Sequence, residues 1–272
     1  MNTIIITTDF SATALNAAQY AIQLAEVVHA DILLVNVFEV LPNYGEMVFD
    51  VNVDKLTEDA TYEIEALKNE LIKNTNTTVH IKTLVMLGDF FQELETVCNE
   101  TKPYAVVMGS QGSSAIERFL YGSHVLNVMR DLEWPIVAVP PKAIYNKIYR
   151  IGVAYDFEAE IEHVLIEKIK STAIDFNAEI HILNFEREDN FDAEYVLTSN
   201  KLERSLKPFE LKFHFVASNQ IVESIVEFVD KNYINLLIVM PKHHSVIEKL
   251  LSKSHTKALI LHSHVPILSL RK

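Results

Sequence analysis

Short runs of β-branched and aliphatic residues alternate along the chain with longer amphipathic segments. The first unit has an apolar run at residues 4–8, followed by Ala, Leu and Ile at helical spacing over residues 12–28. A short apolar run bounded by turn residues is typical of a buried strand, and the helical spacing of apolar residues predicts an amphipathic helix. The chain is therefore expected to begin with a strand, a turn and a helix.

The same alternation continues to residue 140. Further strands are expected at residues 32–37, 79–85, 105–108 and 135–140, and helices at 53–74, 91–99 and 123–132. A loop is expected through residues 42–45. Strand–helix–strand units connect through right-handed crossovers and form a mostly parallel sheet that helices cover on both faces. The first half therefore predicts an α/β fold with five strands.

The second half of the chain repeats the first. Residues 4–11 return as residues 151–158, which places Asp156 opposite Asp9. Four more segments return in the same order: residues 30–37 at 178–185, 106–108 at 238–240, 123–124 at 254–255, and 134–136 at 265–267. This long-period repeat predicts two consecutive domains, residues 1–141 and 146–272, with a boundary near Pro140-Pro141.

The net charge lies almost entirely in the first half. Residues 1–141 hold 19 Asp and Glu against 7 Lys and Arg, and the remaining residues hold 18 against 17, so that −12 of the net −13 belongs to the first half. Nucleic acids and anionic membranes both require a basic surface, so neither is an expected partner.

No apolar run in the chain approaches the roughly 18 residues of a membrane-spanning helix, and the first residues lack the cationic segment of a secretory signal. We therefore expect a cytoplasmic protein. The single cysteine, Cys98, cannot form an internal disulfide and has no His or Asp beside it. It is expected to be a packed helix residue.

A glycine-punctuated loop follows the fourth expected strand. It runs Gly109-Ser110-Gln111-Gly112, then nine residues, then Gly122-Ser123. A loop that leaves a parallel strand for a helix N-terminus offers backbone N–H groups to an anion, and glycine permits close approach of that anion. The serine hydroxyls add donors for phosphate oxygens. Taken alone, Gly-x-x-Gly is equally typical of a plain turn.

The wider pattern, Gly-x2-Gly-x9-Gly-Ser with Asp9 after the first strand, resembles the ATP-binding motif of the universal stress protein family. The resemblance covers nearly the whole chain as two copies. It implies two Rossmann-like or flavodoxin-like open parallel five-stranded sheets of order 3-2-1-4-5, with a ligand at the switch point beyond the carboxyl ends of the strands. It also implies that the halves pack as a pseudo-dimer through their last strands, residues 136–139 and 267–270. Association of two chains into a homodimer stays open.

The resemblance also assigns the nucleotide contacts. It places Asp9 and Thr8 near the ribose and adenine, and the main chain of Val37 beside the base. The residues implied around the phosphates are Gly109, Ser110, Gly112, Gly122 and Ser123. An alternative for Asp9 is a carboxylate that stabilises a helix N-terminus, because Asp156 persists in the copy that has lost the glycines.

The second copy departs from the motif. Proline at 241 and histidine replace Gly109 and Gly112, Lys253 replaces Gly122, and one residue has been dropped between them. Proline removes an N–H donor, and side chains now occupy the phosphate space. We therefore expect no ATP binding by the second half in the family manner.

Other clusters of polar residues carry weaker hypotheses. The second half contains His243, His244, His255, His262 and His264, without a clear ligand spacing or a carboxylate or thiol beside them, so no metal site is expected. Its lysines Lys242, Lys249, Lys253 and Lys257 fit a solvated helix face better than a second anion site. A solvated face is likewise expected for Glu58, Asp59, Glu63, Glu65 and Glu70.

Efficient hydrolysis is not expected, because the P-loop Gly-Lys-Ser/Thr is absent and the cation nearest to the glycines in the first half is Arg118. The acidic first half should need Mg²⁺ or Mn²⁺ to hold phosphates. The leading hypothesis is an ATP-binding regulatory or protective module of the stress response. One alternative is a weak ATPase or nucleotidyl-transfer enzyme that uses Asp9 and Arg118. Another is an interaction scaffold with no nucleotide.

Overall fold

Strands and helices alternate through both halves of the computed structural model, as the apolar pattern predicts. The structure describes residues 2–40, 52–75, 77–110, 124–155, 161–184, 193–216, 221–240 and 263–271. In the first half these residues form β1 (Asn2–Thr7), α1 (Ala12–Val28), β2 (Ala30–Phe38), α2 (Val53–Thr75), β3 (Ile81–Leu87), α3 (Phe90–Thr101), β4 (Ala105–Gly109), helical residues 124–131 and β5 (Ile136–Val139). The loop expected at residues 42–45 lies outside them.

The second half repeats this order. Its elements are β6 (Arg150–Ala154), α5 (His163–Phe176), β7 (Glu179–Asn184), α6 (Ala193–Ser205), β8 (Leu211–Phe215), α7 (Ile221–Lys231), β9 (Leu236–Val239) and β10 (Ile267–Ser269). None of the helices in the described part of the chain is long and apolar enough to cross a lipid bilayer.

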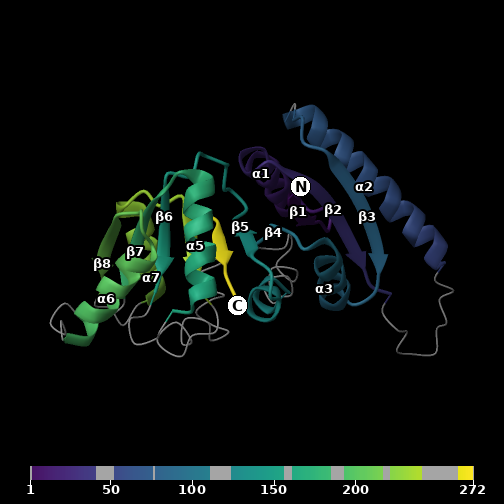
Figure 1. The fold of residues 1–272 in the computed structure, drawn as a ribbon. Helices are drawn as coiled ribbons and strands as arrows, with labels where there is room; N and C mark the ends of the chain where they lie inside the picture. The colour runs from purple at the N-terminus through teal and green to yellow at the C-terminus, as the bar shows by residue number, and fades with distance from the viewer. Residues whose placement is uncertain are drawn as a thin grey trace.

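Ten strands form one sheet in the order β3-β2-β1-β4-β5-β10-β9-β6-β7-β8 (Figure 1). Each half has the expected order 3-2-1-4-5, and the strands within each half pair in parallel. The two halves meet through an antiparallel pair, β5 with β10, in which Leu268 lies opposite Val137. The expected five-stranded sheets are therefore halves of one continuous sheet. This pairing covers two apolar edges that would otherwise be open to other chains.

Helices bury apolar residues on both faces of the sheet. Helices α1, α2 and α5 pack on one face, where α1 of the first half contacts α5 of the second. Helices α3 and α7 and residues 124–131 cover the other face. Cys98 is buried in α3, as expected, and burial raises the pKa of its thiol to about 12. A thiol protonated at neutral pH is a packing residue rather than a nucleophile.

Side-chain hydrogen bonds also connect the halves. The Tyr104 hydroxyl donates to Asp175 Oδ2 of α5 at 2.7 Å, and the Ser269 hydroxyl donates to the Met129 carbonyl at 3.0 Å. The Asn16 amide of α1 donates to the carbonyls of Pro140 and Ala143 at 3.0 and 3.1 Å. Contacts of the halves therefore involve the sheet, both of its faces and the connection between β5 and β6.

Candidate functional site

A cleft of about 660 Å³ lies at the carboxyl ends of β1, β2 and β4. In the strand order β1 lies between β2 and β4, so the chain reverses direction across the sheet at this point. Ligands of open α/β sheets bind at such a reversal. The described residues that line the cleft are Thr7, Thr8, Asp9, Phe10, Thr13, Ala14, Asn36, Val37, Phe38, Glu39, Leu56, Asp59, Ala60, Glu63, Phe90, Met108, Gly109, His124 and Val125.

The turn between β1 and α1 is held by its own side chains. The Thr8 hydroxyl accepts the Phe10 N–H at 3.0 Å, and Asp9 Oδ1 accepts the Ser11 N–H at 3.0 Å. Ser11 then caps α1 by accepting the Ala14 N–H at 3.2 Å. Phe10 has a φ of 62°, in the left-handed region, and the bonds on either side of it hold that conformation.

Asp9 combines the two interpretations that its sequence position allows. It lines the cleft, and its Oδ1 holds the turn just before the N-cap of α1. This local bond gives the aspartate a structural reason to be present without any ligand. Its contact with ribose or adenine stays a prediction.

The end of β2 contributes a residue that sequence reasoning missed. Asn36 is buried, and its amide donates to the Thr8 carbonyl at 2.8 Å, while the Thr8 N–H donates to the Val35 carbonyl at 2.9 Å. The described residues provide no partner for Asn36 Oδ1. In the sequence, the sign of this residue is a polar amide side chain within the otherwise apolar run of residues 32–37. Val37, predicted beside the base, follows Asn36 in the cleft wall.

Gly109 ends β4 directly beneath the first turn of α1. A Cβ on Gly109 would lie 3.1 Å from the Thr13 carbonyl oxygen and 3.4 Å from the Ala14 nitrogen, so any larger residue would push strand and helix apart. Ser110 follows it. Ser110 is 1% exposed, its N–H donates to the Val139 carbonyl at 2.9 Å, and its hydroxyl has no partner among the described residues.

Four of the eight predicted contact residues therefore line one cleft: Thr8, Asp9, Val37 and Gly109. Ser110 is buried behind Gly109 and is not among the described lining residues. Gly112, Gly122 and Ser123 lie outside the described part of the chain, and so does Arg118. Helix α2 adds a wall that was not predicted. Asp59 and Glu63 are solvent-exposed, as expected, yet they face the cleft.

Carboxylates dominate the electrostatics of this cleft. Asp9, Glu39, Asp59 and Glu63 line it, and no Lys or Arg stands among its described lining residues. The N-terminal end of α1 also faces the cleft through Thr13 and Ala14. A helix N-terminus favours an anion, whereas the carboxylates oppose one. A phosphorylated ligand in this cleft would therefore meet both the attraction of the helix N-terminus and the repulsion of the carboxylates.

No group of three or more His, Cys, Asp or Glu in the described part of the chain is placed to hold a metal by itself. Of the five histidines that the sequence singled out in the second half, His264 is described, and its Nε2 lies 2.9 Å from Asp230 Oδ1 of α7. His243, His244, His255 and His262 lie outside the described residues, as do the four lysines of that segment. A divalent cation at the cleft would therefore need ligand oxygens as well as protein oxygens.

The strand register corrects one detail of the sequence alignment. Ile4 pairs with Ala105, and its counterpart Ile151 pairs with Leu236, so the offset here is 131 residues. The same offset relates β5 to β10, because Val106 pairs with Ile136 and Leu237 pairs with Ile267. Met240, not Pro241, therefore occupies the place of Gly109, and no residue has been dropped. The sequence alignment was wrong because the apolar runs of β4 and β9 match equally well one residue apart.

The fold and the cleft define an open, doubly wound α/β protein with a ligand-sized hollow at the switch point of one half. The model of the universal stress protein family matches residues 1–140. The chain belongs to this family.

Two relatives illustrate the match. The universal stress protein MJ0531 of Methanocaldococcus jannaschii is 30% identical over 139 residues, which cover 50% of this chain and 80% of that protein. The crystal structure of a universal stress protein from Archaeoglobus fulgidus has a TM-score of 0.73 at 15% identity and covers 100% of this chain and 96% of that chain. The first relative supports the family, and the second supports the fold of both halves.

Proposed function

We propose that residues 1–141 form a domain that binds one adenine nucleotide, ATP together with Mg²⁺ or Mn²⁺, and that residues 146–272 form a domain without this activity. In this proposal the protein is a cytoplasmic module of the stress response whose conformation or partner choice depends on the nucleotide. The observation that carries the proposal is the cleft of about 660 Å³ at the carboxyl ends of β1, β2 and β4.

The size and lining of the cleft support an adenosine. Its volume lies within the range of about 300–1,000 Å³ typical of small-molecule sites. Val37, Leu56 and Ala60 provide apolar surface for a base, and Asn36 and Asp9 provide polar atoms close by. On the β4 side of the cleft, the N-terminal turn of α1 lines the wall beside Gly109, and a helix N-terminus favours phosphates.

The acidic lining supports the divalent cation. Asp59 and Glu63 of α2 face the cleft, and phosphates placed there would meet carboxylates on several sides. When bound, the cation would neutralise phosphate charge, with Asp9, Glu39, Asp59 and Glu63 as the available protein oxygens. The proposal assigns no hydrolytic role to the cleft, since catalysis of phosphoryl transfer depends on positioned cations and a group that orients water.

Calorimetric titration tests the proposal. We expect one ATP per chain with Mg²⁺ present, a loss of affinity of at least about tenfold when EDTA removes the cation, and adenosine binding that does not respond to EDTA. The double change Asp59→Asn and Glu63→Gln should reduce the dependence on Mg²⁺. Glu58→Gln, on the same exposed helix but outside the lining, is the matched control.

An interaction scaffold without nucleotide is the second candidate. It is favoured by the local reasons that the structure gives for Asp9, which holds a turn, and for Gly109, which packs beneath α1. Absence of any heat with Mg-ATP, together with no nucleotide retained by the purified protein in mass spectrometry, would support the scaffold and contradict the nucleotide site.

A further inference from the structure

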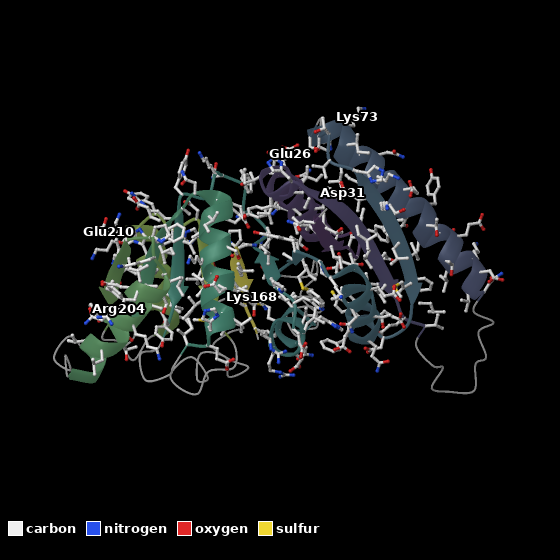
Figure 2. All side chains as sticks on the ribbon, viewed as in Figure 1. Glu26, Asp31, Lys73, Lys168, Arg204 and Glu210 are labelled. Carbon is white, nitrogen blue, oxygen red and sulfur yellow. The ribbon has the colours of Figure 1, made fainter. Side chains whose placement is uncertain are left out.

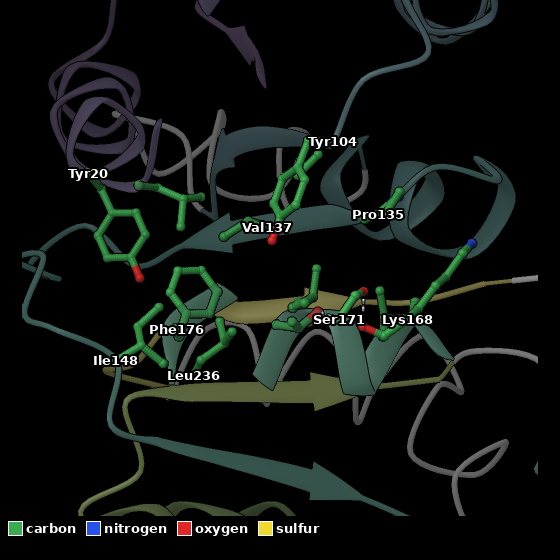
Figure 3. Close-up of a pocket in the computed structure, with 14 residues that line it drawn as sticks. Tyr20, Tyr104, Pro135, Val137, Ile148, Lys168, Ser171, Phe176 and Leu236 are labelled. Carbon is green, nitrogen blue, oxygen red and sulfur yellow. Dashed lines mark hydrogen bonds between the residues drawn. The ribbon is translucent and has the colours of Figure 1, made fainter. Parts of the chain in front are cut away.

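A second cavity, of about 160 Å³, lies where the two halves meet (Figure 3). Its walls come from α1 of the first half, α5 of the second half and the β5–β10 pair between them. Tyr20 and Leu24 face it from α1, Phe176 from α5, and Val137 and Leu268 from the two paired strands. It is separate from the cleft at the carboxyl ends of β1, β2 and β4, because the two share no described lining residue.

The size of this cavity matches a molecule with a single ring. An apolar cavity of about 150 Å³ in a protein core stays dry and takes up benzene. Most residues around the cavity here are aliphatic or aromatic. A compact core leaves few voids of this size, since each costs contacts that neighbouring side chains would otherwise make.

Tyr20 brings a hydroxyl to one end of the cavity. Tyr20 is 3% exposed, and its hydroxyl is directed toward the space beside Ile148 and Phe176 (Figure 3). The ring of Tyr145 packs edge-on against Tyr20, with the two ring centroids 5.1 Å apart, and the buried Tyr145 hydroxyl has no hydrogen-bond partner among the described residues. A molecule bound in the cavity with an oxygen atom beside Tyr20 would accept a hydrogen bond from the Tyr20 hydroxyl.

The hydroxyl of Tyr20 is a donor at any physiological pH. Burial raises the pKa of this phenol above its usual range, and the neighbouring Tyr145 raises it further. A protonated phenol can donate to a neutral oxygen acceptor of a ligand and can also accept from a hydroxyl.

The charged groups at the edge of the cavity are already engaged. The Lys168 ammonium donates to the Arg271 carbonyl at 2.6 Å and points away from the cavity at its far end, at the junction of the halves (Figures 2 and 3). Asp175 accepts the Tyr104 hydroxyl at 2.7 Å. A charged ligand would therefore lose its water without gaining a counter-ion inside.

We propose that this cavity binds a small, uncharged, single-ring molecule that carries one oxygen, of the size of phenol, with that oxygen hydrogen-bonded to Tyr20. The ligand contacts both halves of the chain at once. The assignment goes beyond the nucleotide proposal and does not depend on it.

Titration of the full chain with phenol, benzene and benzoate, followed by the methyl resonances of the protein in NMR spectra, tests the assignment. We expect saturable binding of phenol and weaker binding of benzene and benzoate. Tyr20→Phe should weaken phenol binding about three- to tenfold and leave benzene binding unchanged, because one hydrogen bond is lost and the ring stays. Tyr62→Phe, at a residue that is 78% exposed on α2, is the matched control and should change neither affinity.

A second variant tests the location without removing the tyrosine. Ser171 lies on α5 at the exposed edge of the cavity, so Ser171→Phe can place a ring in the space at little risk to folding. It should abolish saturable binding of both phenol and benzene. Any one of three results overturns the proposal: no saturable binding of phenol to the wild-type chain, phenol affinity unchanged by Ser171→Phe, or benzoate binding more tightly than phenol.

Discussion

The two halves share a sheet order but differ where their strands end. In the first half Ser11 caps α1, and the first turn of that helix lies against Gly109. In the second half α5 begins at His163 without a side-chain cap, later in its repeat than α1, and Met240 stands buried where Gly109 would be. One half therefore keeps helix and strand in close backbone contact beside a cleft, and the other fills the same place with a side chain.

The polar residues at these strand ends differ in the same way. Thr8 and its counterpart Tyr155 both donate their N–H across to the neighbouring strand, at 2.9 and 3.0 Å. Thr8 lines the cleft, whereas the phenol ring of Tyr155 is buried in the core. The comparison teaches that buried strands preserve this fold, while a few residues beyond their carboxyl ends decide whether a hollow remains for a ligand.

In the middle of the strands, by contrast, the second half has a smaller residue than the first. Gly152 in β6 stands where β1 has Ile5, and His181 in β7 stands where β2 has Leu33. The space above Gly152 holds the Phe228 ring, which lies edge-on against His214 at 5.1 Å. The second half therefore has a smaller residue in the core of its sheet and larger ones at its strand ends.

The largest effect is expected from Gly152→Val. An added Cβ would lie 2.9 Å from Phe228 Cε1 and 3.1 Å from Ile234 Cγ2, so the free energy of unfolding should fall by about 2–3 kcal/mol through overpacking. Urea denaturation measures it. The matched change in the first half, Ile5→Val, removes one buried methylene and should cost about 1 kcal/mol. A smaller loss for Gly152→Val than for Ile5→Val would contradict the proposed difference in packing.

Exchange of a motif residue between the halves should have the next largest effect. Gly112→His gives the first half the residue type of the second, and ATP should bind at least about tenfold more weakly, which corresponds to about 1.4 kcal/mol. Calorimetry with Mg-ATP measures the change. The reverse change, His243→Gly, serves as the control and should leave the stoichiometry at one nucleotide per chain. Unchanged affinity in Gly112→His would remove the glycines from the site.

A smaller effect is expected at the junction of the halves. Tyr104→Phe removes the hydrogen bond to Asp175 while it keeps the ring, and stability in urea should fall by about 0.5–1.5 kcal/mol. Asp175→Asn retains an acceptor and should cost less. If instead the aspartate change destabilised the protein more than the tyrosine change, the bond would not be what connects α5 to the first half.

The smallest effect is a pH dependence confined to the second half. His181 Nδ1 lies 3.1 Å from His214 Nε2, and burial lowers the pKa of both imidazoles below the ordinary 6.5. The unfolded chain then binds more protons than the folded chain below about pH 6.5, so stability should be complete above that pH and fall as the pH drops. Urea midpoints between pH 7.5 and 5 measure the slope.

The first half supplies the control for this slope. Leu33 and Leu84 occupy the places of His181 and His214, so the double change His181→Leu and His214→Leu should flatten the profile. Glu179, near His181, does not titrate in this window, because its hydrogen bond to Lys212 lowers the pKa of the carboxyl to about 2. A slope that survives the double change would assign the effect to other groups.

Much of the fold was predictable because its signals are local. The apolar runs and helical spacing predicted the strands and helices of the first half to within two or three residues, since burial on one or two faces dictates that periodicity. The motif and its resemblance predicted the strand order and one end of the cleft. The alignment of the two copies was wrong by one residue in β9. The aliphatic residues of β4 and β9 match equally well in two registers one residue apart, so the sequence does not distinguish between them.

The amino-acid sequence by itself determined the alternating elements, the long repeat and the loss of glycines in the second copy, because these depend on residues close together in the chain. Tertiary structure decided the rest. It merged two sheets through β5 and β10, brought Asp59 and Glu63 of α2 to the mouth of the cleft, and enclosed a cavity beside Tyr20. Such features arise from packing between segments far apart in the chain. The local pattern of apolar residues predicts that a helix or strand has a buried face, but not which other element that face will contact.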